Sequence, residues 1–349
     1  MNGLQIPPLT AAMIASSRRR QARHRHALLA SMMVLGLLGF FLTLMAGQTF
    51  TPIPDVVHVL MGESVPGADF TVGQLRLPRA ILAIVAGVSF GLGGAAFQTM
   101  LRNPLASPDI IGITSGASAA AVFAIVILSL SGPTVSLLAV AAGLAVALLV
   151  YGLSAKNGVA GSRLILVGIG VSAMLESMIA YVLSRAPAFT LQEAMRWLTG
   201  SLNGAKLEQS LPVMASLLVF GALILFKARD LEAMRTGDET ATALGVNVPA
   251  TRLIVMISAV GLIATATAVT GPIAFVAFLA GPIATGMFGR RSSILLPAGL
   301  VGAVLVLIGD FVGQFLLPGR YPVGVVTGAL GAPYLITLII RNNRRGGTP

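Results

Sequence analysis

Residues 74–120 read QLRLPRAILAIVAGVSFGLGGAAFQTMLRNPLASPDIIGITSGASAA, and this stretch decides the fold. Two arginines, Arg76 and Arg79, stand before about twenty apolar and small residues, the length of a helix that crosses a bilayer. A turn at Asn103-Pro104 ends this crossing, and a second apolar run begins at once. The stretch predicts a helical membrane hairpin with its charges kept at the ends.

Small residues recur along both halves of this hairpin. Gly87 and Gly91 in the first half, and Gly112 and Gly116 in the second, are spaced four residues apart. This small-xxx-small spacing lets membrane helices approach closely. We therefore expect both helices to pack tightly within a bundle.

The composition of the whole chain supports this interpretation. Hydrophobic residues make up 56 % of the 349 residues and charged residues only 10 %, and the mean hydropathy is +0.90. Soluble domains carry about 25 % charged residues, so the chain is predicted to be an all-α polytopic membrane protein. The absence of cysteine excludes disulfides and thiolate metal sites.

About ten apolar segments follow one another along the chain, and all are predicted to be transmembrane helices. They cover residues 27–46, 78–101, 110–130, 134–153, 164–183, 207–226, 253–270, 271–289, 294–317 and 323–340. The organisation expected is a basic cytoplasmic tail (1–26), one transmembrane domain (27–341) and a short cytoplasmic tail (342–349). The first segment lacks a clear cleavage site and is interpreted as an uncleaved span. Short helices are expected near residues 54–61 and around Trp197.

Basic residues test this topology. With ten crossings, seventeen of the 23 lysines and arginines fall in loops on the side of the N-terminus. The positive-inside rule places that side in the cytoplasm. The net charge of +11 is thus explained by topology and does not require a nucleic-acid partner.

Few residues in the chain are suited to chemistry. The three histidines lack ligand spacing, and no G-x-x-x-x-G-K-[ST] motif is present, so no metal site, cofactor or catalytic residue is predicted, and ATP coupling would need a second polypeptide. Two carboxylates, Glu176 and Asp310, fall inside predicted spans, where an ionised group is costly. They either couple transport to protons or ions, or pack against other helices.

Two further features remain open on the residues alone. Arg76, Arg79 and Arg320 lie on the outer side, either to bind an acidic partner or to reach lipid headgroups. The polar loop at 227–252 is either a solvated connection or a contact for a cytoplasmic protein.

Four motifs resemble a known family. They are LRLPR (75–79), RNPLASPDIIGITSGA (102–117), ALGVNV (243–248) and YPVGVVTGALGAPYL (321–335). In order and spacing, over nearly the whole chain, they resemble the iron-siderophore, haem and cobalamin class of ABC importer permeases. The resemblance implies a type II importer fold in the bacterial inner membrane, with both termini in the cytoplasm, and alternating access driven by ATP.

The resemblance also implies partners and site residues. The partners would be a second permease subunit, two cytoplasmic ATPase subunits and a periplasmic or lipid-anchored binding protein that delivers a ferric siderophore. Residues similar to those that dock the binding protein are Arg76, Arg79 and Arg320. Residues similar to the ATPase-coupling helix are Asp238, Glu239, Thr240, Ala243, Leu244, Gly245 and Val246. We expect the path to be lined by Gln98, Asn103, Gly112, Ser115, Gly116 and Ser118.

One departure and several alternatives accompany this resemblance. Many relatives carry Pro-His-x-x-Arg where residues 280–286 read AGPIATG, without the histidine and the arginine. This difference reflects either a different cytoplasmic contact or membership of a heterodimeric permease pair, and the resemblance to ferric-siderophore systems favours the pair over a homodimer. Haem or cobalamin as the substrate, or a proton-coupled secondary transporter using Glu176 or Asp310, are the alternative functions.

Overall fold

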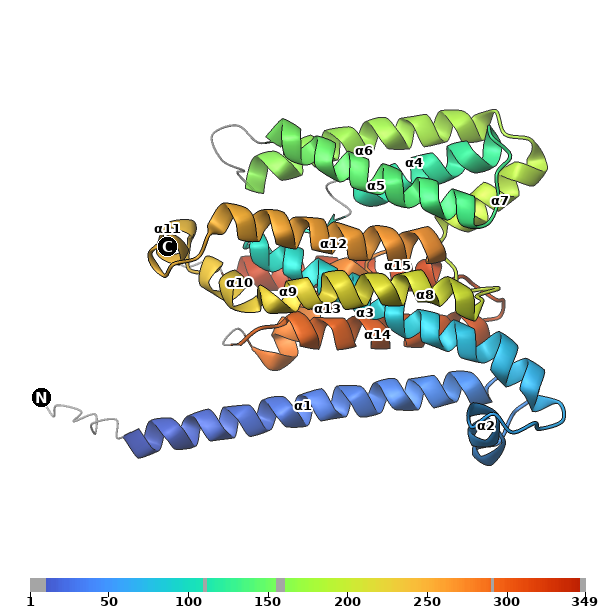
Figure 1. Ribbon diagram of the computed structural model, residues 1–349, viewed down its shortest axis with the longest axis horizontal. Helices are drawn as coiled ribbons and strands as arrows, with labels where there is room; N and C mark the ends of the chain where they lie inside the picture. Colours follow the sequence, from blue (N-terminus) through green and yellow to red (C-terminus); the bar gives the residue numbers. More distant parts are fainter. Residues whose placement is uncertain (1–10, 109–111, 155–160, 290–291, 346–349) are drawn as a thin grey trace, which may run out of the picture.

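The computed structural model describes residues 11–108, 112–154, 161–289 and 292–345, and within these ranges all regular structure is helical (Figure 1). Among these described residues, seven helices are long and apolar enough to cross a membrane, and three shorter apolar helices accompany them. Together they match the ten predicted segments, which confirms the all-helical polytopic fold. Lys156, Arg290 and Arg291 lie outside the described residues.

The bounds of the helices agree with the predicted segments to within a few residues in most cases. The apolar helices are α1 (Ala11–Met45), α3 (Leu77–Met100), α4 (Ile113–Val126), α5 (Pro133–Ser154), α6 (Gly161–Ser184), α8 (Leu207–Ser216), α9 (Ala222–Phe226), α12 (Val248–Thr270), α13 (Val276–Phe288), α14 (Leu295–Phe311) and α15 (Val323–Arg345). Three π-helical segments extend or join them: η1 (Asp69–Arg76) precedes α3, η3 (Leu217–Gly221) joins α8 to α9, and η4 (Val312–Leu316) follows α14. The connecting helices are α2 (Ile53–Leu60), α7 (Ala188–Leu198), α10 (Ala228–Met234) and α11 (Asp238–Ala243).

Several helices extend beyond the apolar segments. α1 begins at Ala11, so much of the basic segment 1–26 is helical, and α15 continues to Arg345. α12 begins at Val248 because the Asn247 side chain accepts a hydrogen bond from the Ala250 amide and Pro249 occupies the first turn. Hydropathy marks where a helix leaves the apolar layer, whereas caps decide where the helix ends.

α3 forms the centre of the bundle. In its most apolar window 83 % of residues are buried, against 11 % for α1 and for α6, which lie at the periphery. A Cβ on Gly87 would lie 2.6 Å from the Ala303 Cα, and one on Gly91 would lie 2.2 Å from the Ala298 carbonyl oxygen. The predicted glycine pair therefore does bring α3 into backbone contact with α14.

The second glycine pair packs differently. A Cβ on Gly116 would lie 2.7 Å from the Val146 Cγ2 atom of α5, and Gly112 lies near both Val146 and Ser172 of α6. α4, α5 and α6 form one layer beside the central helices (Figure 1). α10 and α11 lie at one end of the molecule, where α1 also begins, and α2 lies at the opposite end.

Candidate functional site

Arg76 secures the connection between α1 and α2. Its guanidinium donates hydrogen bonds to the Leu44, Met45 and Thr49 carbonyl oxygens and to the Thr51 hydroxyl, at 2.8–3.1 Å. The side chain is half-buried. These four bonds give Arg76 a structural role at this end of the bundle, beside the docking role expected from the sequence.

Arg79 forms an ion pair that sequence reasoning missed. Its Nε and Nη2 atoms each lie 2.6 Å from one Asp310 carboxylate oxygen, and its Nη1 donates to the Asn203 side-chain oxygen at 2.7 Å. The side chains of Arg79 and Asp310 are only 17 % and 3 % exposed. Asp310, which we considered as an ion-coupling or packing residue, thus joins α14 to α3. The available signal was that both residues lie near the outer ends of their predicted spans.

Arg320 differs from the other two arginines. It is exposed, in the turn between η4 and α15. Of the three arginines predicted to dock a binding protein, it alone is in the exposed class in the isolated chain.

The predicted coupling segment forms a compact helical corner at the opposite end. Asp238 starts α11 and lies 3.3 Å from Arg102 and 2.8 Å from Arg252, which attach this corner to the ends of α3 and α12. Leu244, directly after α11, is 68 % exposed, and Gly245 has a φ of 86°, which favours glycine. The remaining predicted coupling residues are Glu239, Thr240 and Ala243, which are exposed, and Val246, which is half-buried.

α10 is attached in a similar way. Asp230 accepts hydrogen bonds from the Lys227 ammonium at 2.8 Å and from the Thr251 hydroxyl at 3.2 Å. The Lys227 hydrogen bond is the largest cause that lowers the pKa of Asp230 below its ordinary value. α10 and α11 are therefore both held to α12 through carboxylates.

The residues predicted to line a path lie on α3, on α4 and in the segment between these two helices. The Gln98 amide donates to the Phe278 carbonyl oxygen at 2.9 Å, and Gln98 is only 5 % exposed between α3 and α13. Asn103 caps its own turn by accepting from the Leu105 amide at 2.9 Å. The other four, Gly112, Ser115, Gly116 and Ser118, belong to α4 or its start. In the described part of the chain, none of the six lines either of the two cavities considered below.

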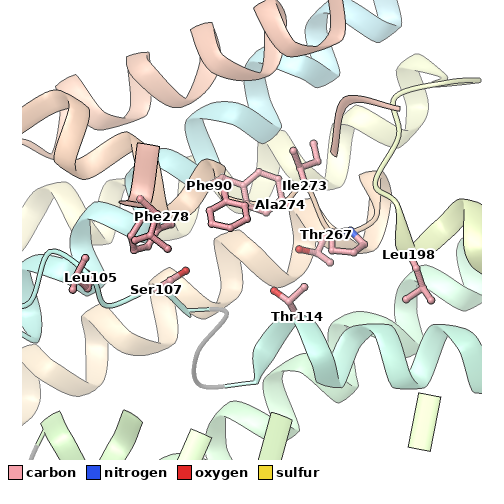
Figure 2. A pocket seen from close by; sticks show the side chains of 12 residues that line it. Phe90, Leu105, Ser107, Thr114, Leu198, Thr267, Ile273, Ala274 and Phe278 are labelled. Carbon is pink, nitrogen blue, oxygen red and sulfur yellow. The ribbon is translucent and has the colours of Figure 1, made fainter. Parts of the chain in front are cut away.

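A cavity of about 610 Å³ lies between α3, α4, α12, α13 and α15. Its walls include the rings of Phe90, Phe275 and Phe278. Three hydroxyl-bearing residues, Ser107, Thr114 and Thr267, also line it, and Figure 2 shows their oxygens among the rings. Its residues reach from Leu105, after α3, to Leu198, at the end of α7 (Figure 2).

A second cavity, of about 660 Å³, is more polar than the first and lies between α5, α7, α8 and α12. Charged side chains line it, among them Glu193, Arg196 and Glu208. Among the described residues, no charged side chain lines the first cavity, so the two cavities differ in the charge of their walls.

Glu176 lies on an outer face of α6. It is exposed in the isolated chain, within a helix that is long and apolar enough to span a membrane. A carboxylate facing lipid at this depth is costly, so this face of α6 suits contact with protein or water. The stretch 280–286 lies inside α13.

The fold defines a class of protein, a polytopic α-helical membrane protein. The chain belongs to the FecCD transport family, which it matches over residues 22–341. It is 39 % identical over 322 residues to the ferric enterobactin transport system permease protein FepG of Escherichia coli (strain K12), covering 91 % of this chain and 96 % of that protein. It is 35 % identical over 324 residues to the Fe(3+)-citrate import system permease protein YfmE of Bacillus subtilis (strain 168), covering 92 % and 96 %.

A solved structure supports the same class. The chain resembles one described as an inward-facing conformation of a putative metal-chelate type ABC transporter. The TM-score is 0.80 at 26 % identity, covering 90 % of this chain and 99 % of that one. The family resemblance inferred from the four motifs is therefore confirmed.

Proposed function

We propose that this chain is a transmembrane permease subunit of an ATP-driven importer for ferric siderophores. The observation that carries the proposal is the similarity across residues 22–341 to a transport family whose similar members are named for ferric enterobactin and Fe(3+)-citrate. The chain is the membrane component and not the ATPase. Its location is the bacterial inner membrane, with α10, α11 and both termini in the cytoplasm.

The two ends of the bundle bind different partners in this proposal. The α10–α11 corner contacts a cytoplasmic ATPase subunit, because exposed Leu244 gives that end an apolar contact while Asp238 transmits movement to α3 and α12 through two arginines. The opposite end, with exposed Arg320, receives an acidic surface of an external binding protein. A second permease subunit covers the face of α6 that bears Glu176.

The test is uptake of iron(III) chelates into vesicles that contain the chain, its ATPase partner and its binding protein. We expect uptake to require ATP hydrolysis and both partners. Uptake without the ATPase would contradict the proposal. Competition by haem or cobalamin at equal concentration would instead assign the chain to another substrate of the same class.

The exposed carboxylate of Glu176 favours one second candidate, a proton-coupled transporter. That function predicts uptake that collapses with an uncoupler, continues without ATP and is lost in Glu176→Gln. Asp310 is less suited to such a role because its carboxylate is already paired with Arg79.

A further inference from the structure

The 660 Å³ cavity keeps its charged residues at one end, whereas the residues deeper along its helices are uncharged. The charged residues are Glu193 and Arg196 on α7 and Glu208, the second residue of α8. Along α5 the lining begins at Pro133, the first residue of the helix, and reaches Val140. At a rise of about 1.5 Å per residue, this wall extends roughly 10 Å along the helix. The described lining is therefore amphipathic along the direction of the spanning helices.

The position of the cavity suits contact with lipid. It lies beside α7, at the end of the bundle opposite α10 and α11 (Figure 1). The spanning helices on its two sides expose apolar side chains: Leu137 of α5 is 71 % exposed and Leu211 of α8 is 59 % exposed. Trp197 also lines the cavity, and an indole ring prefers the level of the lipid headgroups. A lipid at this level of the bilayer can reach the cavity from the side.

The charged groups of the cavity are open to a ligand. Glu193, Arg196 and Glu208 are all exposed, and none of them forms an ion pair with another described residue. Asn203 lines the same cavity, and its side-chain oxygen accepts a hydrogen bond from Arg79 at 2.7 Å, which leaves its NH₂ group as a donor. The cavity thus offers N–H donors to an anion and two carboxylates to a cation.

A zwitterionic aminophospholipid matches this set of groups. Its phosphate can accept hydrogen bonds from the Arg196 guanidinium, whose planar fork fits phosphate oxygens. Its ammonium group can donate to the carboxylates of Glu193 and Glu208. Two carboxylates and one guanidinium give the described lining a net negative charge, which disfavours a headgroup that carries only negative charge. A choline headgroup has no N–H to donate to the carboxylates.

We propose that the 660 Å³ cavity is a binding site for one phospholipid of the ethanolamine type. Its headgroup is held at α7, and one of its acyl chains lies along α5 and α8. In the orientation proposed above, this lipid belongs to the outer leaflet. Because the cavity lies between α5 of the α4–α6 layer and α8 and α12 outside that layer, the bound lipid joins these two parts of the bundle.

The test measures which lipids the purified full-length chain retains in detergent, by native mass spectrometry. The probes are dioleoyl phosphatidylethanolamine, phosphatidylglycerol and phosphatidylcholine, each added over a range of concentrations. The variants are Arg196→Gln and the double change Glu193→Gln with Glu208→Gln. Arg185→Gln is the matched control, because Arg185 is also exposed at this end of the bundle but does not line the cavity. All the changed residues are exposed, so each variant should keep the wild-type Tm within about 1–2 °C.

We expect the wild type to retain one phosphatidylethanolamine in preference to the other two lipids. Arg196→Gln should weaken this binding about 3- to 10-fold, because the phosphate loses a charge-assisted hydrogen bond. The double variant should remove the preference for ethanolamine over choline, because the ammonium group loses both carboxylates. Arg185→Gln should bind all three lipids as the wild type does.

Several results would overturn the inference without bearing on the import function. Equal retention of the three lipids by the wild type would show only unspecific lipid contact. A preference that survives both Arg196→Gln and the double variant, or that Arg185→Gln weakens equally, would place the lipid outside this cavity. If lipid retention stays unchanged while Arg196→Gln slows association of the binding protein, the cavity belongs to a protein interface and not to a lipid.

Discussion

Replacing Asp310 with asparagine tests the ion pair that joins α14 to α3. The asparagine has nearly the same shape but carries one amide group where the carboxylate had a second acceptor oxygen. It can therefore accept only one of the two 2.6 Å hydrogen bonds from Arg79, and its NH₂ group faces the other guanidinium N–H. Arg79 keeps its bond to Asn203.

The expected loss follows from burial. The Asp310 side chain is 3 % exposed and the Arg79 side chain 17 % exposed, so solvent screens this ion pair only weakly. Breaking a buried pair by changing one partner costs about 3–5 kcal/mol. For 349 residues and an unfolding entropy of about 2.1 cal/mol/K per residue, this loss lowers Tm by roughly 4–7 °C.

The assay is thermal unfolding of the purified chain in detergent, followed by intrinsic fluorescence or by aggregation. Glu176→Gln is the matched control, because it makes the same chemical change in a spanning helix at an exposed position. Its expected effect is below about 0.5 kcal/mol. A Tm for Asp310→Asn within about 1 °C of the wild type, on the same entropy scale, would refute the argument that this pair stabilises the fold.

Three further predictions concern the packing and the two ends of the bundle. Gly94→Ala should destabilise the chain by at least about 1–3 kcal/mol in the same melting assay, because the new Cβ would lie 1.9 Å from a backbone oxygen of α13. Gly93→Ala is the milder control, because its Cβ would lie 3.0 Å from a movable isoleucine side chain and 3.3 Å from the Ala259 carbonyl oxygen, and equal Tm values for the two variants would contradict this prediction. Leu244→Glu should weaken binding of the ATPase subunit about tenfold or more, as measured by co-purification, because a charge replaces an apolar contact, and the Tm should not change. Undiminished binding would exclude Leu244 as a contact. Arg320→Glu should slow association of the binding protein at low salt, with a smaller effect at high salt, as measured by surface plasmon resonance. Arg185→Glu, at another exposed arginine, serves as the control. If both charge reversals slow association equally, the effect comes from general charge and not from docking at Arg320.

The sequence predicted most of the fold because bilayer thickness sets the length of each apolar run. The segments at 134–153 and 207–226 match α5 and the run from α8 to α9 closely. Prediction was less accurate where caps or extensions act: α12 starts at Val248 and not at residue 253, and η1 lengthens α3 at its outer end. These differences arise from local hydrogen bonds that hydropathy does not register.

The candidate site was predictable in part. The ATPase-coupling and docking roles that the motifs imply stay predictions, whereas Gly87 and Gly91 do form the close helix contact that their spacing predicts. The path residues stay a prediction, and the structure adds that Gln98 and Gly116 also contact neighbouring helices. A small or polar residue in a membrane helix can either pack against another helix or line a path, and the amino-acid sequence around it does not distinguish these two roles.

By itself the sequence determined the class of protein, its ten apolar helices and the charge difference between its two sides, because composition and segment length act locally along the chain. Only the tertiary structure decided that Arg79 pairs with Asp310, 231 positions away, and that Phe90, Phe275 and Phe278 line one cavity. These features depend on which faces of distant helices meet. Close packing of many small residues at once selects these contacting faces, so the sequence of one helix alone does not predict its partner.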